Sequence, residues 1–126
     1  MSAAGSRYEN AVARYFEAWN ATARDALDKA VAAAWSEDGS YTDPLAEVHG
    51  HDGITAVIAA AHEQFPGFSF RLAGPVDGHH DIARFGWELV NEADGTAPVA
   101  GFDVITLDGE DRIRSVHGFL DRVPGQ

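Results

Sequence analysis

The hydrophobic residues of this chain change their spacing once, at Pro66-Gly67, and this change limits the folds the chain can adopt. Before that point they recur every three or four residues, which is typical of amphipathic helices. After it they alternate with polar residues, which is typical of half-buried strands. Helices followed by strands predict an α+β fold, in which the helices pack on one face of an antiparallel sheet.

Three helices are expected before Pro66. Their predicted apolar faces are Tyr8, Val12, Tyr15, Phe16 and Trp19, then Leu27, Ala30, Val31, Ala34 and Trp35, and then Ile54, Val57, Ile58, Ala61 and Phe65. The Glu37-Asp38-Gly39 segment is expected to end the second helix, and Asp52 to cap the third. A short strand is expected at residues 40–43, because the residue before Pro44 favours an extended backbone.

Four strands are expected after Gly67, at residues 68–76, 82–90, 99–107 and 112–120. Turn-forming residues separate them, so consecutive strands are expected to pair as an antiparallel meander. The chain shows no internal repeat or linker, and 126 residues fit one domain spanning residues 1–126. A curved sheet wrapped around the helices would leave a pocket between them.

Composition excludes several kinds of partner. Twenty acidic residues stand against nine Lys and Arg, giving a net charge of −11, which disfavours nucleic acid and anionic membrane surfaces. The chain has no Cys, so disulfides and thiolate chemistry are excluded. Its apolar stretches are far shorter than the ~20 residues of a membrane helix. The N-terminal residues 1–6 lack the pattern of a signal peptide, so a cytoplasmic location is expected.

Three polar residues stand in surroundings that look apolar or turn-forming. Asp103 interrupts an otherwise apolar strand, where an ionised carboxylate needs a partner or must stay protonated. Tyr15 lies on the apolar face of the first helix, and Asp43 precedes Pro44 at a strand end. Each has a structural explanation, as a hydrogen-bonded acid, a core tyrosine and a turn residue. Together they place a phenol and two carboxylates where all three could border one pocket.

The order of these residues resembles the nuclear transport factor 2-like superfamily, which includes SnoaL-like polyketide-cyclase-like proteins and ketosteroid isomerase. The resemblance covers nearly the whole chain. The matching positions are Arg14-Tyr15, Asn20, Asp43-Pro44, Phe102-Asp103, Gly109, Ile113 and Ser115. It implies a conical α+β barrel, with three N-terminal helices packed on a curved, mainly antiparallel sheet that encloses a deep apolar pocket. It also implies a homodimer formed through the sheet.

The resemblance is closest in motif to ketosteroid isomerase and implies a cofactor-free isomerase acting on an apolar, steroid-like carbonyl compound. In that reaction type a carboxylate base moves a proton on the carbon skeleton, while a phenol and a protonated carboxyl bind the dienolate oxygen. By position, Asp43 would be the base, and Tyr15 and Asp103 the two donors. The pocket lining is expected to include Trp19, Trp87, Val116 and Leu120, although Trp19 and Trp87 also suit core packing.

Two other functions remain open from the sequence. A SnoaL-like polyketide cyclase uses a late acid, and Asp121 lies close to that position but is expected to fall past the last strand. A binding module for a hydrophobic small molecule would need no catalytic residue. The related epoxide-hydrolase chemistry is disfavoured, because glycines stand at positions 101 and 118 where acidic or basic residues would be required. The segment between Tyr15 and Asp43 also departs from ketosteroid isomerase by a few extra residues, within residues 21–36.

The histidines give no convincing metal site. His49, His51, His79 and His80 fall in predicted loops without an Asp or Glu at ligand spacing, so solvated loop histidines are expected. His62 is expected on the surface of the third helix or at the pocket rim. The scattered glycines form no phosphate-binding loop, so neither a metal nor a nucleotide cofactor is expected.

Overall fold

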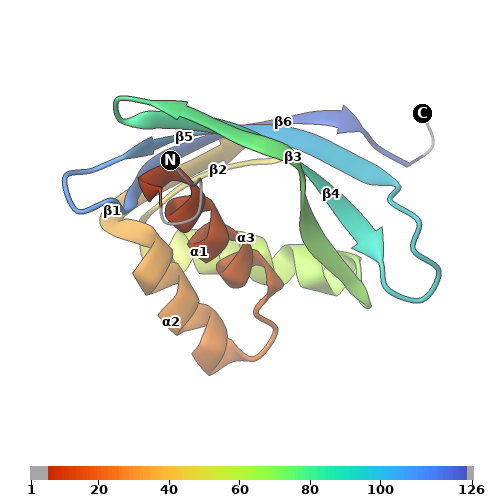
Figure 1. Cartoon of the computed structure of the whole chain (residues 1–126). Coiled ribbons are helices and arrows are strands. Elements are labelled where there is room, and N and C mark those ends of the chain that lie inside the picture. The colour runs from red at the N-terminus through yellow and green to blue at the C-terminus, as the bar shows by residue number, and fades with distance from the viewer. Residues whose placement is uncertain (1–5, 125–126) are drawn as a thin grey trace.

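The structure, a computed structural model, describes residues 6–124 and shows three helices on one side of a curved six-stranded sheet (Figure 1). This confirms the predicted α+β fold class. Residues 1–5, which carry most of the segment used to predict the absence of a signal peptide, lie outside the described range. Within residues 6–124, no helix combines the length and the hydropathy needed to cross a membrane.

The predicted elements follow one another in the expected order, with one additional short strand, β2, before the third helix. The helices are α1 (Arg7–Asn20), α2 (Arg24–Ala34) and α3 (Gly50–Gln64). The strands are β1 (Trp35–Asp43), β2 (Ala46–His49), β3 (Phe68–His79), β4 (Ile82–Asn91), β5 (Val99–Leu107) and β6 (Ile113–Arg122). The four strands predicted after Gly67 are therefore all present, and three of them extend one to three residues further than the alternation indicated.

The sheet has the strand order β2-β1-β6-β5-β4-β3. Strands β3 to β6 pair antiparallel in sequence order, which is the predicted meander. Strand β1 joins the meander by parallel pairing with β6, and β2 folds back on β1 as the outer edge. The two edge strands, β2 and β3, do not pair with each other, so the predicted barrel is an open, curved sheet.

The core lies between the helices and the concave face of the sheet (Figure 1). Ser6 caps the start of helix α1: its hydroxyl accepts a hydrogen bond from the Glu9 backbone N–H and donates one to the Glu9 carboxylate. The buried residues of α1 are Ala11, Val12, Tyr15, Ala18 and Trp19, so the face predicted from spacing points into the core. This packing holds Tyr15 and Trp19 over the sheet.

The boundary between α2 and β1 differs from the prediction. The helix ends at Ala34, and the strand begins at Trp35 rather than at Ser40. Trp35 is fully buried and pairs with Ile113 of β6, and a register shift separates this pair from the next at Ser40. A buried residue beside a parallel partner is apolar in either state, so its hydrophobicity alone did not distinguish helix from strand.

The start of α3 also differs. The helix is preceded by a short strand, β2, which was not predicted, and its N-cap is His49 rather than Asp52. Gly50 has φ = 81°, a left-handed conformation that glycine adopts without steric strain and that lets the chain turn from β2 into the helix. Asp52 lies in the first turn instead, where its negative charge still favours the helix dipole.

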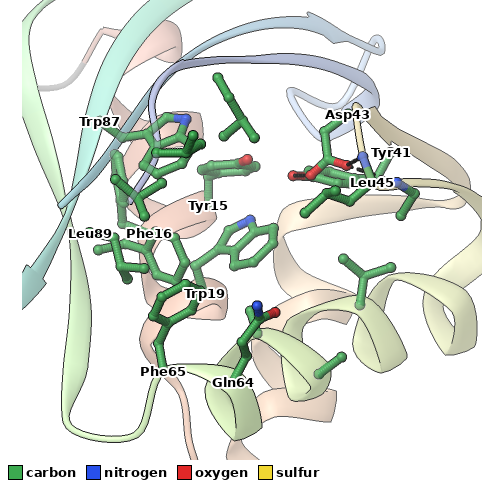
Figure 2. A pocket seen from close by; sticks show the side chains of 18 of the residues that line it. Tyr15, Phe16, Trp19, Tyr41, Asp43, Leu45, Gln64, Phe65, Trp87 and Leu89 are labelled. Atoms are coloured by element: carbon green, nitrogen blue, oxygen red, sulfur yellow. Dashed lines mark hydrogen bonds between the residues drawn. The ribbon is translucent and has the colours of Figure 1, made fainter. Parts of the chain in front are cut away.

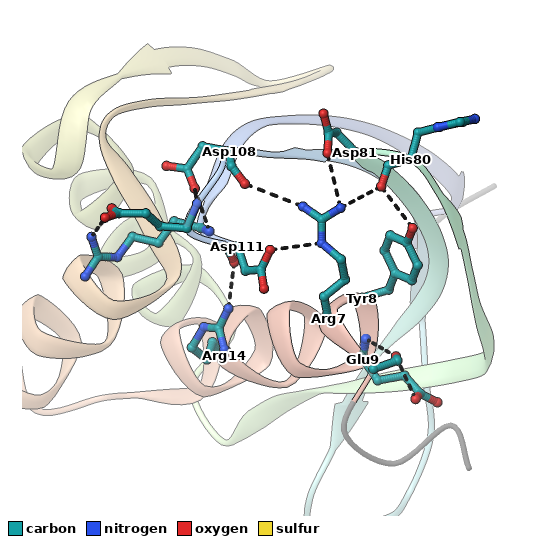
Figure 3. Close-up of polar contacts among 11 residues, drawn as sticks. Arg7, Tyr8, Glu9, Arg14, His80, Asp81, Asp108 and Asp111 are labelled. Atoms are coloured by element: carbon teal, nitrogen blue, oxygen red, sulfur yellow. Dashed lines mark hydrogen bonds and ion pairs between the residues drawn. The ribbon is translucent and has the colours of Figure 1, made fainter. Parts of the chain in front are cut away.

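A cluster of polar contacts holds the start of α1 against the β3–β4 and β5–β6 turns of the sheet (Figure 3). The Arg7 guanidinium pairs with Asp81 in the β3–β4 turn and with Asp111 in the β5–β6 turn, at 3.1 and 2.9 Å. It also donates to the backbone oxygen of His80 at 2.8 Å, which Tyr8 shares through its hydroxyl. One arginine thereby ties the helix that carries Tyr15 to two turns of the meander.

The outer, convex face of the sheet bears an exposed aromatic residue. Phe119 of β6 is 59% exposed and stands opposite Phe102 of β5, which is half-buried. An exposed aromatic residue on this face is compatible with the homodimer implied by the resemblance. That assembly stays a prediction.

Candidate functional site

A cavity of about 400 Å³ opens between α1, α3 and the concave face of the sheet (Figure 2). Its size is within the range of small-molecule sites, and most of its lining is apolar. The lining residues from the helices and the C-cap of α3 are Tyr15, Phe16, Trp19, Val57, Ala60, Ala61, Gln64 and Phe65. Those from the sheet and its loops are Tyr41, Asp43, Leu45, Ala46, Phe70, Trp87, Leu89, Val99, Leu120, Val123 and Pro124.

Asp103 is the most buried acid near this cavity, and two donors hold it. The strand alternates buried and half-buried residues along its whole length, which puts Asp103 on the concave face with only 2% of its surface exposed. The Tyr15 hydroxyl donates to Oδ2 of Asp103 at 2.5 Å. The indole N–H of Trp87 donates to Oδ1 at 3.1 Å. Both carboxyl oxygens are therefore engaged.

Burial shifts the ionisation of this pair. Loss of solvation raises the pKa of Asp103 to about 6, the hydrogen bonds from Tyr15 and Trp87 oppose the rise, and the charge of Asp43 adds to it. Burial, followed by the charge of Asp103, raises the pKa of Tyr15 well above its ordinary value. The phenol of Tyr15 thus keeps its proton at neutral pH and remains a hydrogen-bond donor.

Two glycines make room for this network. A methyl group at Gly101 would lie 2.2 Å from Cζ2 of Trp87, so the indole can reach Asp103 only across a residue without a side chain. A methyl group at Gly118 would lie 2.8 Å from Oδ1 of Asp103 and 3.4 Å from Cβ of Asp43. The two acids therefore approach the same glycine. Sequence reasoning used these positions only to disfavour another chemistry, although glycine inside a strand often marks a close approach.

Asp43 is held at the end of β1 by three donors. Its Oδ1 accepts the backbone N–H groups of Leu45 and Ala46, at 2.8 and 2.9 Å, and its Oδ2 accepts the Tyr41 hydroxyl at 2.6 Å (Figure 2). Burial, followed by the hydrogen bond to Asp43, raises the pKa of Tyr41, so Tyr41 stays a donor. The sequence singled out Asp43 but missed Tyr41, which alternation places on the same side of the strand.

The structure separates the candidate residues into those that face the cavity and those that do not. Tyr15 and Asp43 line it, whereas Asp103 lies behind Tyr15 and Trp87 and is not a lining residue. The predicted pocket residues Trp19, Trp87 and Leu120 line the cavity. Val116 does not line it, because its side chain is fully buried in the hydrophobic core.

Other candidates lie away from the cavity or serve the fold. Asp121 is exposed and falls inside β6, which runs to Arg122, rather than past the strand as expected. His51 is a helix residue whose Nε2 contacts the backbone oxygens of Trp35 and Ser36 rather than a solvated loop residue. His62 links α3 to α1 through the backbone oxygen of Trp19, at 2.7 Å. Within residues 6–124, no group of three or more potential ligands is placed to hold a metal ion.

The raised pKa of Asp103 predicts that the stability of the protein falls as the pH rises from about 4 to about 7. The folded state binds this proton more tightly than the unfolded state, whose pKa is near 3.8. The stabilisation is full below the unfolded pKa and is lost as the pH passes the folded pKa. Asp103→Asn removes the titrating group, while its amide can still donate to Tyr15. The pH-dependent part of the unfolding free energy, on the order of 2–3 kcal/mol, should therefore be absent in the variant. It is measured from urea titrations across this pH range, as the difference in unfolding free energy between wild type and variant.

Asp94→Asn is the matched control for this titration. The backbone N–H and hydroxyl of Thr96 lower the pKa of the exposed Asp94, so its contribution has the opposite sign and disappears as the pH falls. If wild type and Asp103→Asn lose stability in parallel between pH 4 and 7, Asp103 does not carry the perturbed pKa.

Comparison with known proteins places the chain in a family. A model of the SnoaL-like domain matches residues 12–116. The chain belongs to the SnoaL-like family. A search of curated proteins finds no match. The resemblance to SnoaL-like proteins noted in the sequence is thereby confirmed.

Solved structures agree with this assignment. A proposed isomerase of the SnoaL-like family from Agrobacterium tumefaciens is 41% identical, with a TM-score of 0.86 over 91% of this chain and 97% of that one. A proposed SnoaL-like polyketide cyclase from Jannaschia is 18% identical, with a TM-score of 0.75 over 96% and 90% of the two chains. An NTF2-like protein of unknown function from Cytophaga hutchinsonii is 14% identical, with a TM-score of 0.64 over 96% and 95%. The last two likenesses establish the fold alone.

Proposed function

We propose that the protein is a cofactor-free isomerase of the ketosteroid-isomerase type, which moves a proton along the carbon skeleton of an uncharged, apolar carbonyl compound. The observation that carries the proposal is that a carboxylate, Asp43, and a protonated phenol, Tyr15, line the same apolar cavity. The similar SnoaL-like protein from Agrobacterium tumefaciens, itself a proposed isomerase, supports the same class of reaction.

The proposed reaction needs only a base and a hydrogen-bond donor. Asp43 removes a proton from the carbon between the C=C and C=O groups, and the electron pair moves through the carbonyl to leave negative charge on oxygen. The Tyr15 hydroxyl stabilises that charge by donating a hydrogen bond. The proton then returns to the far end of the former double bond, which leaves Asp43 ionised again. In the structure the Tyr15 hydroxyl donates its proton to Asp103. When Asp103, whose pKa is raised to about 6, holds its own proton, it donates to the phenol oxygen instead, and the Tyr15 hydroxyl is then free to donate to the substrate oxygen.

The charge of the cavity favours an uncharged substrate. Among the described lining residues, none is Lys, Arg or His, whereas Asp43 contributes a negative charge. The whole chain adds a net charge of −11. A carboxylate or phosphate on the substrate would enter this cavity without a counter-charge, which is unfavourable. A neutral ketone meets the apolar walls and the Tyr15 donor without that penalty.

The proposal is tested by mixing the purified protein with androst-5-en-3-one and following the absorbance of the conjugated product, androst-4-en-3-one. We expect a saturable rate above that of buffer and of an unrelated acidic protein. Absence of turnover at protein concentrations that bind the product would show that the steroid-isomerase assignment is wrong.

A second candidate function is binding without chemistry, which the contacts of Asp43 favour. The two backbone N–H groups and the Tyr41 hydroxyl give this carboxylate a complete structural role in the β1–β2 turn. In that case the cavity would bind the steroid ketone, turnover would be absent, and Asp43→Asn would bind as tightly as wild type.

A further inference from the structure

We propose that the indole N–H of Trp19 is a second hydrogen-bond donor to the ligand's oxygen atom, alongside the Tyr15 hydroxyl. The inference rests on the proposed function for the presence of a carbonyl oxygen at this end of the cavity. It adds a ligand-binding role to a residue that sequence analysis treated as an apolar wall.

The indole nitrogen of Trp19 is a buried donor without a partner. The side chain is 5% exposed, and its Nε1 has no hydrogen-bond partner among the described residues. Only one other buried side-chain polar atom within residues 6–124 shares this condition, Nε1 of Trp35. Buried polar groups nearly always have partners, so an unpaired donor on a residue that lines a cavity, with the donor atom just beneath the cavity surface, points to an acceptor supplied by a ligand.

The position of Trp19 matches that of the other cavity donor. It follows Tyr15 by one helical turn on α1, and the two rings have centroids 6.1 Å apart. Figure 2 shows its indole nitrogen pointing toward the region of the Tyr15 hydroxyl and the Asp43 carboxylate. From this position the Trp19 indole has a small lowering effect on the pKa of Tyr15, the last among the influences on that pKa. The two groups nevertheless do not meet in hydrogen-bond geometry.

Asp103 does not supply the second donor that the resemblance to ketosteroid isomerase implies, and the Gln64 amide, which also lines the cavity, lies on α3 rather than beside Tyr15. The resemblance assigned this donor role to Asp103 by its position in the sequence. In the structure the Tyr15 hydroxyl and the Trp87 indole donate to the two oxygens of Asp103, and its carboxyl does not line the cavity. Trp19 lines the cavity and carries a free N–H. It can therefore bind the oxygen directly, whereas Asp103 acts through Tyr15.

Binding requires a small movement of the indole. Its nitrogen has almost no contact with solvent, and the centroids of the Trp19 and Tyr41 rings are 5.5 Å apart. An entering carbonyl oxygen must turn the Trp19 ring toward the cavity. The ring then gains an acceptor that it lacks at present, and this gain favours ketones over hydrocarbons of the same shape.

The test uses the full chain labelled with ¹⁵N and androst-4-en-3-one as the probe. The chain has three Trp residues, so three indole N–H signals are expected, each assigned from its own Trp→Phe variant. We expect the Trp19 proton signal to move downfield when the ketone binds, while that of Trp35 stays in place. Absence of a downfield shift in the wild-type protein at saturating or soluble-limit ketone would overturn the proposal.

Affinity provides a second measurement, with Trp35→Phe as the matched control. Trp19→Phe should weaken ketone binding roughly 2- to 12-fold, the range expected for one neutral hydrogen bond. Trp35 has the same unpaired N–H but is fully buried and does not line the cavity, so Trp35→Phe should not change the affinity. Equal affinities of wild type and Trp19→Phe would overturn the proposal.

The binding measurements separate this inference from the proposed function. A downfield shift and a loss of affinity in Trp19→Phe without turnover would support the donor role of Trp19 and contradict the isomerase. Turnover without a downfield shift and without a loss of affinity would support the isomerase and contradict the donor role of Trp19.

Discussion

Asp43→Asn is expected to lower the isomerisation rate of androst-5-en-3-one about 10²- to 10⁴-fold, the usual contribution of a positioned base. Asparagine has almost the same shape but cannot take up the proton from carbon. Its amide oxygen can still accept the N–H groups of Leu45 and Ala46, and its NH₂ can donate to the Tyr41 hydroxyl. The β1–β2 turn should therefore survive, and the loss should appear in kcat with little change in thermal stability.

Tyr41→Phe serves as the control for this prediction. It removes the 2.6 Å hydrogen bond to Asp43 but leaves the carboxylate and both of its backbone contacts. We expect a much smaller effect on kcat, because the carboxylate that takes up the proton is unchanged. If Asp43→Asn turns over substrate at the wild-type rate, Asp43 is not the base and the turn role is its function.

Gly101→Ala is expected to destabilise the protein by about 1–3 kcal/mol, the usual effect of overpacking a core. The added methyl group would stand 2.2 Å from Cζ2 of Trp87 and 2.6 Å from the backbone oxygen of Phe119. Since the strand pairs on both sides, the indole must move and its hydrogen bond to Asp103 breaks. That bond lowers the pKa of Asp103, so its loss should raise this pKa further above about 6.

Both consequences are measurable by urea unfolding at several pH values. The midpoint should fall in Gly101→Ala, and the pH range over which stability declines should move upward. Gly109→Ala is the matched control, because its methyl group would meet nothing within 4 Å and the residue is exposed. An unchanged midpoint in Gly101→Ala would mean that Trp87 is not held over this glycine.

Hydrophobic spacing predicted the elements well where the helical period of three to four residues can be told apart from the strand period of two. The alternation of β5 matched the observed strand residue for residue, because one of its faces is buried and the other half-exposed. The spacing failed at Trp35 and at β2. A register shift and the exposed residues Glu37 and Asp38 separate Trp35 from the regular part of β1, so no alternation marks the start of that strand. Strand β2 has only four residues, too few to show a period.

Part of the candidate site could be predicted from the sequence, because two of its residues depart from the local pattern around them. Asp103 stood out because a carboxylate on an apolar strand must be explained, and Asp43 because it precedes a proline at a strand end. The contributions of Tyr41, Gly101 and Gly118 were missed, although a strand-interior glycine is a usable signal. Tyr41 is an ordinary strand residue, so its role becomes evident only from its contact with Asp43.

The sequence by itself determined the α+β order of elements, the acidic surface and the placement of Tyr15, Asp43 and Asp103 on three separate elements. These properties follow from local spacing and composition, which act over a few residues. Only the tertiary structure decided that Asp103 lies behind Tyr15 rather than at the cavity wall, and that the indole of Trp19 is left without a partner. Both depend on distances of a few ångströms between residues far apart in the chain, and pairing of β1 with β6 and packing of α1 on the sheet set those distances.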